Sequence, residues 1–465
     1  MKRTIGWLAA VLLAGLAIAA PQATSPQQAA AKGGERAGSE FTLAAAGDAL
    51  ITRKLAGYQE PSFLKLIELV RGADAAFTNL EMLFHDYESY PMNESGGTWM
   101  RADPVLAKDL TWAGFDLVSR ANNHTGDYGV AAMRLTTKHV KDAGLVQAGV
   151  GESLAEAREA KFLDTPNGRV ALISISSSYP DHARASNSRG DVPARPGLNP
   201  LRFTTTNFIS RERMEGLRAT MIEMGLTPPA AADQLTFLSR RFVVGDKPGV
   251  RTEPLQRDLD EIARVVKSAS RMADYTIVTH HSHQAGSNRS MPAEFVVTFA
   301  HAMIEAGASV FVGHGPHVLR GVEIYQGKPI LYSLGDFMFE NETLLRFPAE
   351  AYEAQGLDTD AQIADFNARR SDNDRRGFNV DREIWESVVA TLRWRGQELT
   401  ELKLHPISLG FGLSMSERGR PMLANPELSR KIVDDVSARS APFGTKVVLD
   451  QGIGRVVLPG QSPER

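Results

Sequence analysis

Five short clusters of Asp, Glu, Asn and His side chains could bind a metal ion or transfer protons. They are Gly47-Asp48, Asn79-Leu80-Glu81, Asn122-Asn123-His124, His280-His281-Ser282-His283 and Gly313-His314-Gly315-Pro316-His317. Carboxylate oxygens and imidazole nitrogens are suitable ligands for Mn²⁺, Fe²⁺ or Zn²⁺. Because the chain has no cysteine, thiolate ligands, a cysteine nucleophile and disulfide bonds are all excluded. The clusters therefore predict a site for one or two divalent ions.

The histidines are concentrated in these clusters. The chain has 11 histidines, and six of them lie in the three clusters that contain His124, His281 and His314. Two ions about 4 Å apart could activate a water molecule and stabilise a phosphate-like transition state. Each residue alone also has an ordinary structural explanation, such as a helix cap for Asp48 or a turn for Asn122. The prediction therefore depends on the clusters taken together.

Buried strands are expected to position these clusters. The segments 41–46, 75–81 and 169–178 are predicted strands. They alternate with predicted helices such as 254–272. Strands that alternate with helices indicate an α/β fold. In such folds ligands bind at the carboxyl ends of the strands, so five strand ends could bring the clusters to one point.

Two polar segments interrupt the alternation of strands and helices. Residues 180–253 and 341–378 are expected to be insertions at the surface, near the loop ends of the strands. Residues 383–408 alternate between apolar and polar positions and predict two antiparallel strands. We therefore expect a main domain over 41–410 with these two insertions, followed by a helical extension over 411–465.

The N-terminus has the pattern of an export signal. Lys2 and Arg3 precede an apolar stretch from Ile5 to Ala19, so residues 1–20 predict a secretory signal peptide. The alternative is an uncleaved N-terminal membrane anchor. Residues 21–40 are rich in Ala, Gln, Gly, Pro and Ser and predict a flexible linker. The mature protein is therefore expected in the periplasm or outside the cell.

The overall composition is that of a globular protein. Hydrophobic residues make up 43% and charged residues 23% of the chain, and the formal net charge is −3. The sequence has no basic stripe or block, so the charge pattern gives no support for binding nucleic acid.

The order of the motifs resembles the CapA family of poly-γ-glutamate capsule proteins, which are similar to metallophosphatases. The resemblance covers about residues 41–340. It is carried by Gly47-Asp48 with Arg53, Asn79-Leu80-Glu81, Ala121-Asn122-Asn123-His124 with Asp127-Tyr128-Gly129, Gly313-His314-Gly315-Pro316-His317-Val318 and Tyr332-Ser333-Leu334-Gly335-Asp336-Phe337. It implies a calcineurin-like fold, a four-layer α/β/β/α sandwich.

The resemblance also implies roles for individual residues. The implied metal ligands are Asp48, Glu81, Asn123, His281, His283, His314 and His317. Glu81 would be the bridging carboxylate, and His124 would be a ligand or the acid that faces the leaving group. Arg53 would hold an anionic substrate with its planar guanidinium.

Three departures from the family pattern are visible. The usual His-Trp-Gly is His281-Ser282-His283 here, so His283 could share the role of His281. The usual Ser-Leu-Gly-Asn-Phe has Asp336 in place of Asn. The Asp-x-His opening of ordinary metallophosphatases is absent, because Ala49 and Leu50 follow Asp48.

Three functions fit these observations. One is a metal-dependent hydrolase, similar to a phosphoesterase, that acts on an anionic substrate outside the cytoplasm. Another is a component of poly-γ-glutamate or capsule polymer synthesis or export, which would bind or cleave the γ-glutamyl polymer or assist a membrane synthase. The third is a module of the cell envelope that binds metal or anions without catalysis.

Overall fold

The computed structural model describes residues 40–358 and 360–461. The predicted signal peptide and almost all of the predicted linker lie outside the described residues. Within the described part, no helix combines the length and the apolar character needed to cross a membrane.

One mixed sheet contains the N-terminal strands. Its strand order is β23-β24-β21-β20-β1-β2-β5-β6; β19 also pairs with β1, and β22 with β21. The bounds are β1 Glu40–Leu50, β2 Ala75–Leu80, β5 Leu117–Ser119, β6 Val146–Ala148, β19 Asp336–Phe339, β20 Glu386–Arg395, β21 Glu398–Ser408, β22 Met422–Leu423, β23 Val447–Asp450 and β24 Ile453–Val456. The predicted antiparallel strands within 383–408 are thus confirmed as β20 and β21.

A second sheet has the order β17-β18-β16-β15-β9-β8. Its bounds are β8 Lys161–Thr165, β9 Gly168–Ser176, β15 Tyr275–His281, β16 Val310–His314, β17 Val322–Tyr325 and β18 Lys328–Leu331. β9, β15 and β16 are parallel, so their carboxyl ends lie at one edge. This edge carries His281 and His314.

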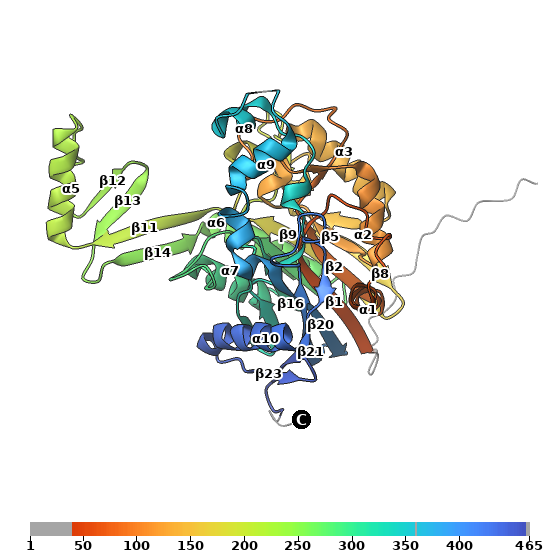
Figure 1. Cartoon of the computed structure of the whole chain (residues 1–465). Helices are drawn as coiled ribbons and strands as arrows, with labels where there is room; N and C mark the ends of the chain where they lie inside the picture. The colour runs from red at the N-terminus through yellow and green to blue at the C-terminus, as the bar shows by residue number, and fades with distance from the viewer. Residues whose placement is uncertain (1–39, 359, 462–465) are drawn as a thin grey trace, which may run out of the picture. The chain divides into compact units, whose positions relative to one another are not determined.

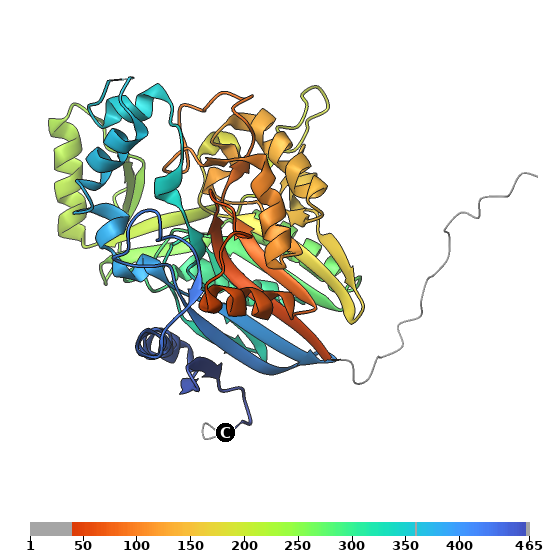
Figure 2. The same cartoon turned by 45° about the vertical axis from the view of Figure 1, so that its right-hand side comes forward.

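The two sheets pack face to face, with helices on their outer faces (Figures 1 and 2). The core between the sheets joins residues such as Leu43 and Phe77 of the first to Leu172 and Val312 of the second. The first sheet is covered by α1 (Pro61–Arg71) and α2 (Ala107–Ala113), with α3 (Gly129–Asp142) beside them. The second is covered by α6 (Gln256–Ala269) and α7 (Glu294–Glu305). This layer order confirms the predicted α/β/β/α sandwich.

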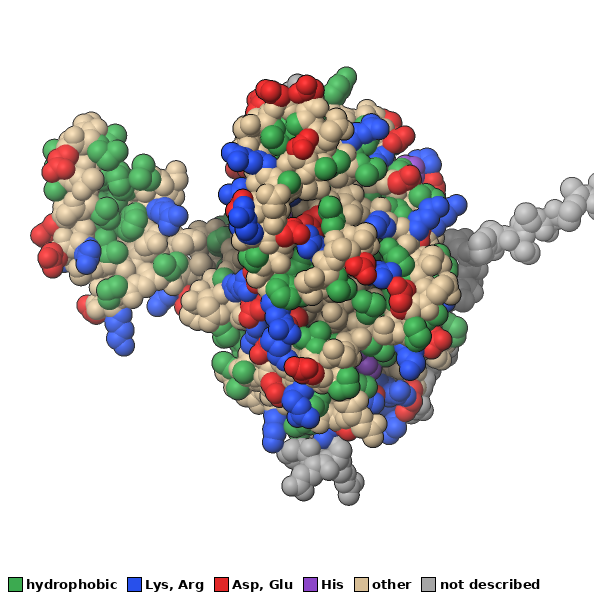
Figure 3. All heavy atoms as spheres, in the orientation of Figure 1, with side chains coloured by type: hydrophobic (Ala, Val, Ile, Leu, Met, Phe, Trp, Pro, Cys, Tyr) green, Lys and Arg blue, Asp and Glu red, His purple; other side chains and the backbone are tan. Residues whose placement is uncertain are grey.

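The first predicted insertion contains a projecting arm, formed by residues 203–254. Its elements are β11 Phe203–Ile209, α5 Arg211–Glu223, β12 Gln234–Phe237, β13 Arg240–Val244 and β14 Gly249–Pro254. β11 and β14 form an antiparallel ribbon, and α5, β12 and β13 lie at its far end (Figure 1). Hydrophobic side chains are exposed on this arm, among them Ile222 and Leu238 (Figure 3). The remainder of the insertion, 180–202, packs against the main body.

The second predicted insertion and the C-terminal segment also have regular structure. Residues 341–378 include η4 (Asn341–Thr343), α8 (Ala349–Ala354), α9 (Ile363–Ser371) and the start of η5 (Gly377–Val380). The segment expected to be a helical extension does contain α10 (Pro426–Ser440). It also adds β22, β23 and β24 to the first sheet, which the prediction did not include, because these strands are only two to four residues long.

The remaining elements are short. They are β3 Leu83–Phe84, β4 Arg101–Ala102, η1 Pro104–Leu106, η2 Asn123–Gly126, β7 Val150–Gly151, α4 Leu154–Arg158, η3 Asp181–Ala183, β10 Gly197–Leu198, η6 Arg382–Trp385 and η7 Ala441–Phe443.

Candidate metal centre

Strand ends from both sheets bring the polar clusters together. Asp48 lies near the end of β1, with Asn79 of β2 beside it on one side and Asp336 of β19 on the other. His281 and His314 are the last residues of β15 and β16, and they lie side by side in the second sheet. The predicted convergence at the carboxyl ends of the strands is therefore what the structure shows.

A close backbone contact places Asp48. The pairing of β1 with β2 shifts in register between Ala45 and Asp48, and at this point β1 approaches the backbone before β19. A Cβ atom on Gly47 would lie 1.8 Å from the carbonyl oxygen of Gly335. Only glycine allows this approach, which lets β1 and β19 present Asp48 and Asp336 next to each other.

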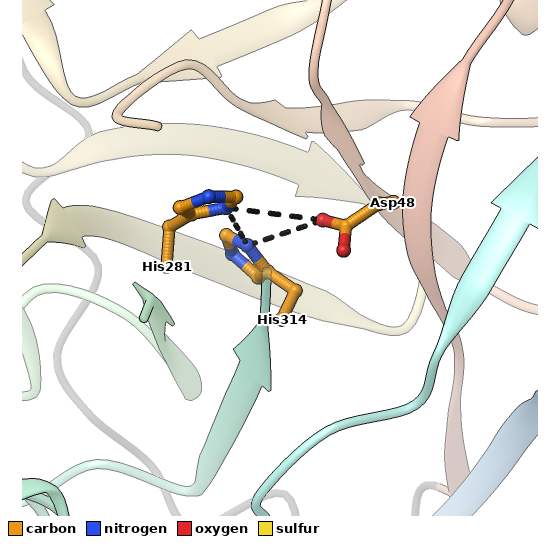
Figure 4. A group of neighbouring side chains, drawn as sticks. All are labelled: Asp48, His281 and His314. Atoms are coloured by element: carbon orange, nitrogen blue, oxygen red, sulfur yellow. Dashed lines mark hydrogen bonds and ion pairs between the residues drawn. The ribbon is translucent and has the colours of Figure 1, made fainter. Parts of the chain in front are cut away.

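The inner group consists of Asp48, His281 and His314 (Figure 4). The Nδ1 atoms of the two imidazoles are 3.0 Å apart. Asp48 Oδ1 lies 3.4 Å from His314 Nδ1 and 3.9 Å from His281 Nδ1. All three side chains are completely buried. Their ligand atoms therefore face one another across a space the size of one ion.

Neighbouring groups fix the orientation of the inner group. Asn79 Nδ2 donates a hydrogen bond to Asp48 Oδ1 (2.6 Å), and the backbone N–H of Gly315 donates to Asp48 Oδ2 (2.8 Å). Thr279 Oγ1 contacts Nε2 of His314, which leaves Nδ1 of that ring facing Asp48. Gly315 has a φ of 111°, and a Cβ atom there would lie 3.0 Å from His281 Nε2.

The outer group surrounds the carboxylate of Glu81. Nε2 atoms of three histidines lie around Glu81 Oε1: His124 at 3.7 Å, His317 at 3.8 Å and His281 at 3.9 Å. Nε2 of the exposed His283 is 3.1 Å from Nε2 of His281. The ring of His281 therefore lies between the two groups, with Nδ1 toward Asp48 and Nε2 toward Glu81.

Two of these imidazoles are held by buried aspartates. Asp127 Oδ2 lies 2.7 Å from His124 Nδ1, and Asp336 Oδ1 lies 2.8 Å from His317 Nδ1. An aspartate at Nδ1 fixes the ring and its tautomer, so Nε2 is the free ligand or proton-transfer atom. His317 also has a positive φ of 55°, a rare conformation for a residue other than glycine.

Burial shifts the protonation of the group. Burial and the neighbouring Asp336 raise the pKa of Asp48 to about 7. Burial, followed by the charge of Asp48, raises the pKa of Glu81 well above its ordinary value. Burial lowers the pKa of His281 and of His314, which keeps both rings neutral. A bound cation would use the neutral imidazoles as ligands and would offset the repulsion between the neighbouring carboxylates.

The donor set fits a divalent cation. Both oxygens of Glu81, Oδ1 of Asn123 and Oδ2 of Asp336 are buried and have no hydrogen-bond partner among the described residues. Buried carboxylates without partners are costly unless a cation compensates them. Ligand atoms about 2.1 Å from a tetrahedral ion lie roughly 3.4 Å apart. The 3.0–3.9 Å separations of the inner group agree with that spacing.

Most of the predicted site residues lie together in the structure. The structure brings together Asp48, Glu81, His124, His281, His283, His314 and His317. Asn123 lies next to His124, with its amide donating to the carbonyl of Gly96 (2.8 Å) and its Oδ1 unpaired. His280 is separate from the group, because its ring packs against Phe299 and Phe311 on the helical side of the sheet.

Arg53 donates hydrogen bonds to a buried carboxylate and to two backbone carbonyls. Its Nε donates to Glu340 Oε1 (2.7 Å), while Nη1 and Nη2 donate to the carbonyls of Ser416 (2.7 Å) and Arg418 (2.6 Å). These bonds favour a bracing role between β19 and the C-terminal segment. Substrate binding by Arg53 stays a prediction.

The sequence assigned no individual ligand or catalytic role to Asp336, Asp127 or Asn79. Asp336 was visible as a departure from the family pattern. Asp127 was part of the motif that follows His124. For both, the signal was present, but their contacts with His317 and His124 required the structure.

Comparisons with known proteins agree with the motifs. Residues 42–341 match the family model of the bacterial capsule synthesis protein PGA_cap. The uncharacterized proteins y4sH and y4uA of Sinorhizobium fredii are each 36% identical over 432 residues, which is 90% of this chain and 93% of theirs. The capsule biosynthesis protein CapA of Bacillus anthracis is 22% identical over 72% of this chain and 66% of its own.

Solved structures give only a weak likeness. The NAD nucleotidase of Haemophilus influenzae is 9% identical, with a TM-score of 0.28 over 86% of this chain and 56% of its own. The motif order, the converging strand ends and the match over 42–341 lead to one conclusion: this chain belongs to the PGA_cap family of bacterial capsule synthesis proteins.

Proposed function

We propose that this protein is a divalent-metal-dependent hydrolase that cleaves an anionic ester or amide during synthesis or processing of a capsule polymer. The observation that carries this proposal is the environment of Glu81. Its carboxylate is completely buried, neither oxygen has a hydrogen-bond partner among the described residues, and three imidazole Nε2 atoms face it within 3.7–3.9 Å. A cation shared by these groups accounts for all three features.

The residues present indicate which ions would fit. The inner group would hold an ion with Asp48, His281 and His314, and the outer group would hold one with Glu81, His283 and His317. Asn123 would add its unpaired Oδ1. Mixed nitrogen and oxygen ligands favour Mn²⁺, Fe²⁺ or Zn²⁺. A divalent ion in this place would act as a Lewis acid toward a substrate oxygen and lower the pKa of a nearby water.

His124 is the proposed proton donor. Asp127 holds its Nδ1, and its Nε2 faces the carboxylate of Glu81 across 3.7 Å. In this orientation Nε2 can deliver a proton to the leaving oxygen or nitrogen of a substrate bound at Glu81. The carboxylate of Asp127 would stabilise the charged ring before the proton leaves it.

The polymer context is proposed from the relatives. Matching proteins include CapA of Bacillus subtilis, whose name gives PGA biosynthesis as its role. By analogy, the substrate of this chain would be a γ-glutamyl polymer or another anionic envelope molecule. Action in the periplasm or outside the cell, N-terminal anchoring in the membrane and assistance to a membrane synthase are part of the same proposal.

The first experiment combines metal analysis with turnover. Purified protein would be analysed for Mn, Fe and Zn, then tested on an aryl phosphate and on γ-glutamyl anilide, with and without added Mn²⁺. Metal-stimulated turnover that His124→Ala abolishes, without loss of metal, supports the proposal. Metal binding without turnover of either substrate would favour a non-catalytic metal- or anion-binding module. Absence of metal after every loading attempt would overturn the metal centre.

A further inference from the structure

An arginine-rich cavity of about 270 Å³ lies apart from the residues of the metal centre. Its lining includes Arg184, Arg195, Arg202 and Arg257, with Glu261 as the acidic side chain and Pro200 at one wall. We refer to this cavity as the arginine pocket. Four guanidinium groups around one small cavity repel one another unless anions compensate them.

The nearby carboxylates are already used by other contacts. Asp258 accepts two hydrogen bonds from the lining residue Arg202 (both 2.8 Å) and one from Arg158 (2.8 Å). Glu261 accepts from Arg257 (2.9 Å) and also pairs with Arg158. Asp258 and Glu261 thus serve three arginines between them, which leaves little negative charge for the rest of the pocket.

Arg195 has side-chain donors that reach no acceptor among the described residues. Its backbone is fixed by reciprocal hydrogen bonds with Ser186, and its Nε donates to the carbonyl of Arg184 (2.8 Å). The two Nη groups make no hydrogen bond or ion pair with any described residue, and the side chain is exposed. Arg184 forms an ion pair with the exposed Asp181 (3.2 Å). The free fork of Arg195 has the geometry for a bidentate bond to an oxyanion.

The walls of the pocket are connected to the metal centre through the backbone. Next to Pro200, the carbonyl of Asn199 accepts from the N–H of Ser176 (3.0 Å), and the adjacent Ser177 N–H donates to the carbonyl of His281 (3.0 Å). On the other side, His182 Nε2 lies 3.2 Å from the carbonyl of Gly126, in the same η2 turn as His124. The segment that forms the pocket is therefore anchored to the end of β9, next to the end of β15 that carries His281, and to the η2 turn that carries His124.

We infer that the arginine pocket binds a second oxyanion, a carboxylate or a phosphate, of a substrate whose reacting group lies at the metal centre. The simultaneous occupation of both places by one molecule rests on the proposed function; anion binding by the pocket does not. Arginine retains its charge at any physiological pH, so the pocket requires only an anionic ligand with suitable geometry.

The test is calorimetric titration of chelator-treated protein with two probes, inorganic phosphate and glutarate. Without metal, no cation at the metal centre can bind the probes, so binding that depends on Arg195 reports the arginine pocket. We expect Arg195→Ala to weaken the preferred probe about 10-fold, the loss of one charge-assisted bidentate contact. Arg195→Lys should retain part of the affinity, because it keeps the charge without the fork. The probe that binds more tightly, glutarate or phosphate, shows whether the pocket prefers a carboxylate or a phosphate.

Arg213→Ala is the matched control, because Arg213 is exposed on α5 and lies outside the pocket. It should bind the probe as the unmodified protein does. The inference is overturned if neither probe binds, if Arg195→Ala binds with unchanged affinity, or if Arg213→Ala loses as much. Because these titrations need neither metal nor turnover, a failed hydrolase assay leaves their outcome interpretable.

Discussion

Asp336 Oδ1 lies 2.8 Å from His317 Nδ1, and this contact joins the first sheet to the loop that follows β16. The carboxylate fixes the ring so that Nε2 points toward Glu81, 3.8 Å away. The Asp336 and Asp48 carboxylates also raise the pKa of His317, although burial alone would lower it. Asp336 therefore controls both the direction and the charge of a candidate ligand.

Asp336→Asn is predicted to weaken metal binding. The amide keeps the size of the side chain and can still accept a hydrogen bond, but it loses the negative charge that supports His317. Loss of such a carboxylate–histidine contact typically costs about 10–100-fold in metal affinity. Competition with a fluorescent chelator measures the affinity. Equal affinity in the two proteins would show that Asp336 does not act through His317.

Glu81→Gln is predicted to have opposite effects with and without metal. In metal-free protein, the buried carboxylate has no hydrogen-bond partner among the described residues and burial raises its pKa, so a neutral amide should increase the melting temperature. Added Mn²⁺ or Zn²⁺ should raise the melting temperature of the unmodified protein but not that of the variant. Differential scanning fluorimetry in chelator and in excess metal measures both effects. Lower stability of the variant in chelator would argue that Glu81 has a compensating partner.

The stabilisation by metal is predicted to increase with pH. The pKa of Asp48 is raised from 3.8 to about 7, so the metal-free folded state binds its proton more tightly than the unfolded chain does. The metal-free protein should therefore lose stability as pH rises from about 4 to about 7. A bound cation offsets the cost of ionising the buried Asp48 carboxyl. The melting temperature difference between metal-loaded and chelated protein should widen from pH 5 to pH 8, and a constant difference would contradict the shift.

Gly315→Ala is predicted to disturb the inner group. The backbone has a φ of 111°, and the new Cβ would lie 3.0 Å from both His281 Nε2 and the backbone nitrogen of Ser282. Strain of this kind costs roughly 1–3 kcal/mol. Both metal affinity and the free energy of unfolding in chelator should fall. Gly327→Ala is the control, since Gly327 also has a positive φ but a Cβ there meets no atom within 4 Å. Metal affinity in that control should be unchanged.

The sequence predicted those parts of the site that depend on local pattern. Apolar segments that end in Asp48, Glu81, His281 or His314 indicate strands, and parallel strands place their ends at one edge. The position of Asp336 could not be derived in this way. After the hairpin β17–β18 in one sheet, the chain crosses to pair β19 with β1 in the other sheet. No local periodicity encodes that change of sheet.

Contacts between distant segments were equally invisible in the sequence. Glu340 lies 287 residues from Arg53, and neither residue is part of a periodic pattern that relates them. The arm formed by β11–β14 and α5 was predicted only as a polar insertion, because its strands pair with one another and bury few side chains. Weak burial gives weak periodicity, so composition alone could not indicate these strands.

Arg53→Ala separates a bracing role from the predicted role in substrate binding. The carboxylate of Glu340 is completely buried and accepts from Arg53 Nε as well as from the backbone N–H groups of Thr52 and Arg53. Removing the guanidinium leaves this buried charge without its ion pair, which typically costs about 3 kcal/mol or more of stability. Chemical denaturation measures this loss, and Arg53→Ala combined with Glu340→Gln should recover part of it, because the unpaired charge is gone. If Arg53→Ala instead leaves stability unchanged and raises KM for an anionic substrate, Arg53 binds the substrate as its motif suggested.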